Sequence, residues 1–176
     1  MTNAVDPYQA SLVTKEQKTA AQAYLDANLE PMPDGWLWET FEPDLDITLE
    51  TGFLEAPGGF AAAKGTIIFL PGFTSPLELY SYGYQRFHDA GFNIAAISYR
   101  GQGRSTRSLA FTHPEKGYVE DYTILADDVE RFVAATRTRV GREKPILVYG
   151  NSKGGHIALR MAGDMLPDIK AIALKV

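Results

Sequence analysis

The chain has 176 residues, 45% of them hydrophobic and 22% charged, and its formal net charge at pH 7 is −5. This length supports one domain with a hydrophobic core, and the composition is ordinary for a soluble globular protein. The negative charge argues against nucleic acid as a partner, and the absence of cysteine excludes disulfides, thiolate chemistry and cysteine-ligated metals.

The first ten residues lack the basic stretch and apolar core of a secretory signal, and no apolar run is long enough to span a bilayer. We therefore predict a cytoplasmic protein and leave peripheral contact with a membrane open.

The N-terminal segment, residues 1–35, is predicted to be a helix and a linker. A capping box at residues 14–17 and apolar residues at helical spacing predict a helix over residues 15–29. The Pro- and Gly-containing stretch 31–35 ends it. Residues 36–176 then form the main domain.

Two strands are predicted next, over residues 36–41 and 46–55, joined by a turn at 42–44. They suggest an antiparallel ribbon at a sheet edge. A turn at 56–59 follows, and the continuous apolar run 66–70 is typical of a strand covered on both faces.

A helix is predicted from Ser75, where Ser75 and Glu78 fit a capping box with proline at the first helical position. Tyr80, Tyr84 and Phe87 form its inner stripe, and Gly91 ends it.

The remaining pattern alternates between strands and helices, which indicates a parallel sheet with helices on both faces. The predicted strands are 92–99, 146–149 and 169–176, and the predicted helices are 121–138, with Leu125, Val129, Phe132 and Val133 on one face, and 153–165.

The last predicted strand runs to the end of the chain without a turn, a helix or a polar tail. It would leave an apolar edge open, which natural domains usually avoid. From this we expect a chain that is cut after this strand.

The strongest functional motif is Gly150-Asn151-Ser152-Lys153-Gly154, which fits G-x-S-x-G between a buried strand and a helix. A tight turn there would present the Ser152 hydroxyl at a helix N-terminus, where free N–H groups favour developing negative charge. Gly150 and Gly154 make room for the turn. The alternative is a turn in which serine is merely small and polar. We predict that Ser152 is a nucleophile.

Leu70-Pro71-Gly72-Phe73 follows directly after a buried strand. Acyl transfer through a serine needs N–H donors for the oxyanion, one after the nucleophile and one in a loop after an earlier strand. The backbone N–H groups of Lys153 and Phe73 are the candidates, although a plain Pro-Gly turn is the alternative.

The segment from Tyr99 to Ser105 contains Gly101 and Gly103 but lacks the third glycine of a dinucleotide-binding loop, and the chain has no P-loop. A structural loop over the carboxyl edge of the sheet is the better interpretation. We expect no cofactor and no metal.

Together these segments resemble the N-terminal half of an α/β-hydrolase of the lysophospholipase and monoacylglycerol lipase-like group of serine hydrolases, in particular bacterial lysophospholipase L2-like proteins. The resemblance rests on the Leu-Pro-Gly-Phe loop, the Arg-Gly-Gln-Gly-Arg-Ser segment, the helix start at 118–122 and the Gly-Asn-Ser-Lys-Gly-Gly elbow, and it covers roughly residues 45 to 176. It implies an α/β fold truncated after the strand that follows the nucleophile helix. It also implies an ester hydrolase acting on a small lipid-like ester.

The sequence departs from the group in three places. Pro71 replaces the usual histidine, and Lys153 replaces methionine or glutamine. The third departure is the triad, which in this fold runs serine, acid, histidine. The only acidic residues after Ser152 are Asp164 and Asp168, and the only histidine is His156. His156 does not match the family's histidine.

His88 and His113 lie before the serine and receive no catalytic role. The lid, acid and histidine segments are therefore expected in a missing C-terminal half, in the same or a second chain. The competing hypothesis is a non-catalytic α/β-hydrolase-like binding protein that is complete at Val176.

Overall fold

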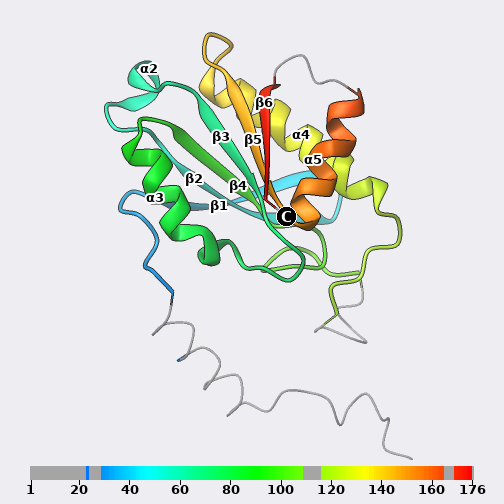
Figure 1. Cartoon of the computed structure of the whole chain (residues 1–176). Helices are drawn as coiled ribbons and strands as arrows, with labels where there is room; N and C mark the ends of the chain where they lie inside the picture. The colour runs from blue at the N-terminus through cyan, green and yellow to red at the C-terminus, as the bar shows by residue number, and fades with distance from the viewer. Residues whose placement is uncertain (1–22, 24–28, 109–115, 165–168, 176) are drawn as a thin grey trace, which may run out of the picture. The chain divides into compact units, whose positions relative to one another are not determined.

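The computed structural model describes residues 23, 29–108, 116–164 and 169–175 (Figure 1). The chain separates into two compact units, Met1–Glu30 and Pro31–Val176. Apart from Ala23, which is helical, and Leu29, the helix predicted over residues 15–29 lies outside the described residues. The second unit carries all the elements discussed below.

A mixed sheet forms the centre of this unit, with six strands in the order β1-β2-β4-β3-β5-β6 among the described residues (Figure 1). β1 pairs antiparallel with β2, β2 pairs antiparallel with β4, and all other neighbours are parallel. The predicted antiparallel ribbon at the edge of a parallel sheet is therefore confirmed. The strands are β1 Leu37–Asp44, β2 Ile47–Leu54, β3 Thr66–Leu70, β4 Asn93–Ile97, β5 Ile146–Asn151 and β6 Ile169–Lys175.

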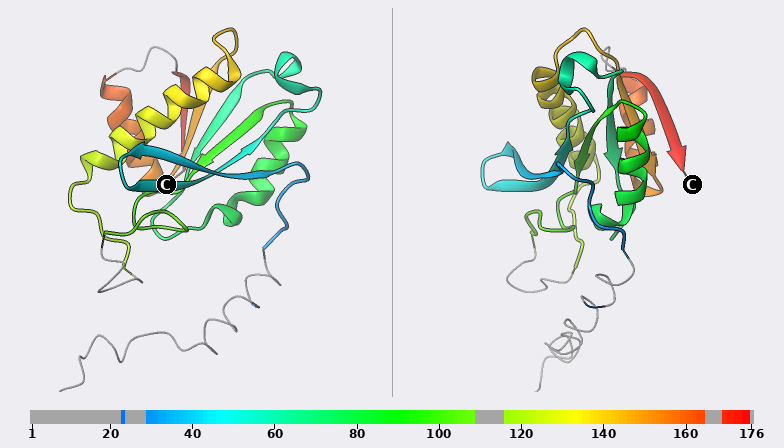
Figure 2. Two further views of the ribbon diagram at one scale, coloured as in Figure 1. Left: turned by 180° about the vertical axis from the view of Figure 1, so that it is seen from behind. Right: turned by 90° about the vertical axis from the view of Figure 1, so that its left-hand side faces the viewer.

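Helices cover both faces of the sheet (Figure 2). On one face, α4 (Thr123–Val140) and α5 (Lys153–Asp164) bury their apolar stripes against side chains such as Ile68 and Val148. On the other face, the 3₁₀ helix η2 (Leu77–Tyr80) and α3 (Ser81–Asp89) pack against Ile67 and Phe69. Successive residues of β3 thus serve opposite cores, which explains its continuous apolar run.

The predicted helical faces agree with this packing. Leu125, Val129, Phe132 and Val133 of α4 are all buried in the first core. Tyr84 is fully buried in the second core, with Tyr80 and Phe87 packed beside it. Gly91 follows the end of α3 with φ 92°, a left-handed conformation that favours glycine.

The turn predicted at residues 42–44 was wrong. These residues belong to β1, and the pairing register shifts between Phe41 and Asp44. Pro43 has no N–H to donate to a ladder, so a bulge in an edge strand accommodates it. The actual turn lies at 45–46, where Asp46 has φ 62°.

The predicted start of the helix at Ser75 was wrong. No side-chain capping bond forms, Pro76 is extended, and the segment divides into η2 and α3. The Ser75 N–H instead donates to Gly72 O over 3.3 Å, which ties Ser75 into the loop after β3. A short helix, α2 (Gly59–Ala62), also occupies the end of the turn predicted at 56–59.

The predicted strand after α5 is confirmed: β6 runs parallel to β5, with Val148 opposite Ile172. Among the described residues, no helix is both long and apolar enough to cross a membrane.

Candidate active site

Ser152 lies at the tip of a tight turn between β5 and α5, with φ 48°. This left-handed conformation is uncommon for a residue with a side chain and marks a strained position. Its side chain is exposed, while its carbonyl accepts hydrogen bonds from the N–H groups of Gly155 (2.8 Å) and His156 (3.2 Å). Ser152 therefore stands at the N-terminus of α5.

The two elbow glycines are required by close backbone approach. A Cβ on Gly150 would lie 2.6 Å from Gly154 O, and one on Gly154 would lie 2.1 Å from Leu70 O. Both distances are shorter than any tolerated contact, so α5 can approach β3 and β5 only because these residues lack side chains.

β6 supports the same turn from its other side. The Ser152 N–H donates to Lys175 O over 2.8 Å. The backbone of the nucleophile candidate is thus fixed by the strand that follows α5.

The loop after β3 lies against the elbow. A Cβ on Gly72 would stand 3.0 Å from Asn151 Nδ2, which places the loop beside the residue that precedes Ser152. Phe73 is 56% exposed, and Thr74 has φ 58°. Among the backbone hydrogen bonds of the described loops and turns, none is donated by the Phe73 N–H or the Lys153 N–H.

The side chain of Lys153 folds back over the loops. Its Nζ donates to Gln102 Oε1 over 2.6 Å and lies 4.5 Å from the ring centroid of Tyr99 and 5.2 Å from that of Phe73. Burial lowers the pKa of Lys153 from 10.5 to about 8. The residue after the serine therefore brings a partly buried amine to the site.

The Gly-rich segment after β4 is held by protein contacts. Gly101 has φ 77°, and a Cβ there would lie 2.9 Å from Tyr118 O. Arg100 binds the carboxylate of Asp128 on α4 through two hydrogen bonds of 2.7 Å. Arg104 pairs with Glu50 and Glu78. These contacts hold the segment against α4, β2 and η2.

The structure brings no histidine to the Ser152 hydroxyl among the described residues. His156 is exposed on α5, and its recorded bond to Ser152 is the backbone bond that begins the helix. His88 is half-buried in α3. His113 and Asp168 lie outside the described residues, and Asp164 ends α5.

Sequence reasoning missed two residues that join the site's loops, Tyr80 and Gln102. The Tyr80 hydroxyl accepts from the Gly72 N–H (2.9 Å) and from Asn151 Nδ2 (3.0 Å). Gln102 Nε2 donates to Gly72 O over 3.1 Å. A polar side chain between two loop glycines is the only sequence signal that points to Gln102.

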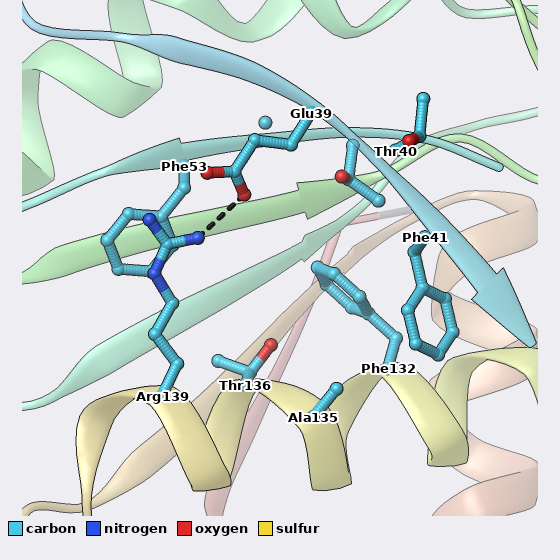
Figure 3. A pocket seen from close by; sticks show the side chains of 10 residues that line it. Glu39, Thr40, Phe41, Phe53, Phe132, Ala135, Thr136 and Arg139 are labelled. Carbon is cyan, nitrogen blue, oxygen red and sulfur yellow. Dashed lines mark hydrogen bonds and ion pairs between the residues drawn. The ribbon is translucent and has the colours of Figure 1, made fainter.

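A hollow of about 120 Å³ lies elsewhere, between α4 and the ribbon of β1 and β2 (Figure 3). Its Arg139 donates to Glu39 over 2.6 Å and stacks over the ring of Phe53, with the guanidinium carbon 3.7 Å from the centroid. The lining charges thus satisfy each other. Since β5 and α5 contribute nothing to the lining, this hollow is separate from the elbow.

Comparison with protein families identifies residues 61–175 as matching the family described as serine aminopeptidase, S33. This range contains β3, the loop after it, the Gly-rich segment and the serine elbow. A lysophospholipase L2 of Escherichia coli K12 is 27% identical over 150 residues, which are 82% of this chain and 41% of the relative. The chain thus spans about two fifths of the length of this curated relative.

Solved structures share the fold. A monoglyceride lipase from Saccharomyces cerevisiae superposes with a TM-score of 0.65 at 19% identity, covering 82% of this chain and 45% of the lipase. A thermostable carboxyl esterase from Bacillus coagulans gives a TM-score of 0.65 at 17% identity, covering 81% and 44%. The predicted α/β-hydrolase fold is confirmed.

Proposed function

The chain belongs to the serine aminopeptidase S33 family of hydrolases, and from this premise we propose that it is the nucleophile-bearing part of a serine ester hydrolase. Its substrates are lipid-like carboxylic esters of the lysophospholipid or monoacylglycerol class. The observation that carries the proposal is Ser152, held at φ 48° on an exposed turn between β5 and α5. The printed names of the relatives, a lysophospholipase and a monoglyceride lipase, support the substrate class.

In the proposed reaction, Ser152 Oγ attacks the ester carbonyl while a general base takes its proton. The Phe73 and Lys153 N–H groups bind the oxyanion of the tetrahedral intermediate. The alcohol leaves with the proton, and water releases the acid from the acyl-enzyme. We place the histidine and the acid of the triad in polypeptide beyond this sequence, in the same or a second chain.

Exposed aromatic side chains around the elbow favour an apolar acyl group. Phe73, Tyr118 and Tyr122 are 40–56% exposed. The Tyr122 hydroxyl donates to Lys153 O (3.3 Å), and a Cβ on Gly117 would lie 3.4 Å from the Phe73 ring. These rings give an acyl chain an apolar surface beside Ser152.

The charge of Lys153 favours an ester substrate over a peptide with a free N-terminal ammonium group. An aminopeptidase must bind a free ammonium group near its nucleophile. The Lys153 amine, on the residue after Ser152, lies 5.2 Å from the Phe73 ring centroid and 4.5 Å from that of Tyr99, and it would repel a second cation bound near Ser152. Peptides are therefore the less favoured substrates.

The test is a substrate panel on the whole natural polypeptide that contains this sequence. Lysophosphatidylcholine, a monoacylglycerol and an aminoacyl anilide are compared in wild type, in Ser152→Ala and in the control Ser108→Ala, an exposed loop serine. We expect ester hydrolysis in wild type and in the control, and a loss of at least 10³-fold in Ser152→Ala. Full activity of Ser152→Ala, or turnover of the anilide alone, would refute the proposal. Ester binding without turnover would favour the non-catalytic binding protein.

The 176-residue chain alone should be nearly inactive on short-chain p-nitrophenyl esters. Without a base the serine is a weak nucleophile, although the oxyanion donors can leave a residual rate of about 10³ over water. Turnover typical of an intact esterase would show that a base exists within these residues, and His156 and His113 would be tested first.

A further inference from the structure

The Gly72–Phe73 peptide carries one of the two oxyanion donors of the proposed function, and the inference below rests on that function. A peptide unit is planar and trans, so its C=O and its N–H point in opposite directions. Whatever holds Gly72 O therefore also sets the direction of the Phe73 N–H.

Both sides of Gly72 are held by side chains from other segments. Its carbonyl accepts from Gln102 Nε2 over 3.1 Å and, over a longer 3.3 Å, from the Ser75 N–H in its own loop. Its N–H donates to the Tyr80 hydroxyl over 2.9 Å. Gln102 is only 3% exposed, so water does not compete freely for this bond.

The orientation of the Gln102 amide is fixed by its second partner. As an ammonium, Lys153 Nζ has no acceptor capacity, and it donates to Gln102 Oε1 over 2.6 Å. The reverse orientation would set Nε2 against the lysine and Oε1 against Gly72 O, with donor facing donor and acceptor facing acceptor. Lys153 therefore makes Gln102 a donor toward Gly72.

Tyr80 is held in the corresponding way from the other side of the serine. Its hydroxyl accepts from Asn151 Nδ2 over 3.0 Å in addition to the Gly72 N–H. The residues immediately before and after Ser152 are thus both connected to Gly72, each through one intervening side chain.

We infer that Gln102, oriented by Lys153, and Tyr80, oriented by Asn151, are positioning residues that aim the Phe73 N–H at the oxyanion formed on Ser152. Neither side chain touches the reacting atoms. The connections through Gln102 and Tyr80 link the Phe73 N–H to the elbow. The elbow carries both the nucleophile and the second oxyanion donor, the Lys153 N–H.

The test compares Gln102→Leu, Lys153→Met and Tyr80→Phe in the whole natural polypeptide. The matched controls lie outside the site: Gln85→Leu at a half-buried position, and Lys64→Met and Tyr82→Phe at exposed ones. Gln85 bonds Asp89 within α3, and Lys64 bonds Ala90 O. We expect each test variant to lower kcat by about 10-fold with KM within twofold, because an oxyanion contact acts in the transition state and direct removal of a donor costs 10²–10³.

The double variant Gln102→Leu/Lys153→Met separates positioning from general damage. If lysine acts through the glutamine, the double variant should be no slower than Gln102→Leu alone, and the coupling should appear in kcat. Should Gln102→Leu fail to fold, Lys153→Met alone tests the connection from Lys153 through Gln102 to Gly72, because Lys153 is only half-buried.

Two failures are distinguishable. If Ser152→Ala retains wild-type hydrolysis, the proposed function fails and the positioning role fails with it. If Ser152 is essential but Lys153→Met, Tyr80→Phe and any folded Gln102→Leu keep kcat within twofold of their controls, only the positioning role is overturned. Strictly additive losses in the double variant would also overturn it.

Discussion

Gly154 and Gly155 are neighbours in one helix, yet a methyl group would meet different surroundings at each. At Gly154 a Cβ would lie 2.1 Å from Leu70 O, which belongs to the β3 backbone and cannot move aside. At Gly155 the nearest atom would be Gly150 O at 3.5 Å, an ordinary contact. The elbow therefore needs its second motif glycine for packing, and the next glycine is dispensable.

We predict that Gly154→Ala lowers the free energy of unfolding by on the order of 3 kcal/mol, the upper end of the overpacking range. Gly155→Ala should be neutral or stabilising by up to about 1 kcal/mol, because alanine is favoured over glycine within a helix. Urea unfolding of both variants measures the difference. Equal stabilities would contradict the close approach of α5 to β3.

Lys153 gives the fold a pH dependence of known sign. Burial lowers its pKa from 10.5 to about 8 in the folded protein, so between these values the unfolded chain binds more protons. The cost of burying the ammonium is fully present below pH 8 and is removed as the pH rises toward 10.5.

The free energy of unfolding of wild type, relative to that of Lys153→Met, should therefore increase between pH 8 and pH 10. Subtraction of the methionine variant removes the contributions of the other titrating groups, including the buried Tyr99 beside the amine. Urea titrations at several pH values measure it. A flat or falling difference would show that the amine is not desolvated.

The elbow could be identified from the sequence because its spacing is local. Ser152, Gly150 and Gly154 lie within five positions, and strand and helix patterns flank them. Tyr80 and Gln102 could not be assigned, because their partners in the elbow, Asn151 and Lys153, lie 71 and 51 positions away. Only the fold shows that these side chains meet at Gly72.

Between elements, an ion pair with two hydrogen bonds joins the Gly-rich loop after β4 to α4. Asp128 is 2% exposed, and both of its carboxylate oxygens accept from Arg100. The same loop carries Gln102, so this ion pair holds a segment of the proposed site against the helix. Loss of one member would leave the other charge without its main partner.

Asp128→Asn should lower the free energy of unfolding by about 2 kcal/mol, less than for a fully buried pair, because Arg100 also contacts Asp44. The matched control is Asp127→Asn, an exposed neighbour on the same helix, which should stay within about 0.5 kcal/mol of wild type. Chemical unfolding of the two variants measures this. A similar stability for both would show that the ion pair does not secure the loop.

The alternation of elements was predictable because buried parallel strands are continuous apolar runs and α4 carries a clear apolar stripe. The errors arose where tertiary structure overrode local signals. Pro43 indicated a turn but occupies a bulge in β1, and Ser75 fits a helix cap but is bound to the loop at Gly72. The bulge depends on the pairing of β1 with β2, and the position of the Gly72 loop depends on its bonds to Tyr80 and Gln102.

On the scale of the whole molecule, β6 lies at one edge of the sheet, and its outer edge pairs with no strand among the described residues. Leu174 on this strand and Leu159 on α5 are both large and exposed. An open edge with apolar neighbours invites association. The same strand supports the elbow through Lys175 O.

The isolated 176-residue chain should therefore self-associate, and Ala173→Lys, which adds a charge to the edge strand, should reduce association. Ala61→Lys on the exposed surface of α2 is the control. Light scattering over a concentration series measures it. A monodisperse monomer, or equal association of the two variants, would contradict this role of the edge.

An activated Ser152 should react covalently with a fluorophosphonate. Labelling of the whole natural polypeptide, followed by mass mapping of the modified peptide, measures this. We expect one label, on Ser152, and its loss in Ser152→Ala but not in Ser108→Ala. Labelling that persists at full strength in Ser152→Ala, or that maps to another residue, would contradict it.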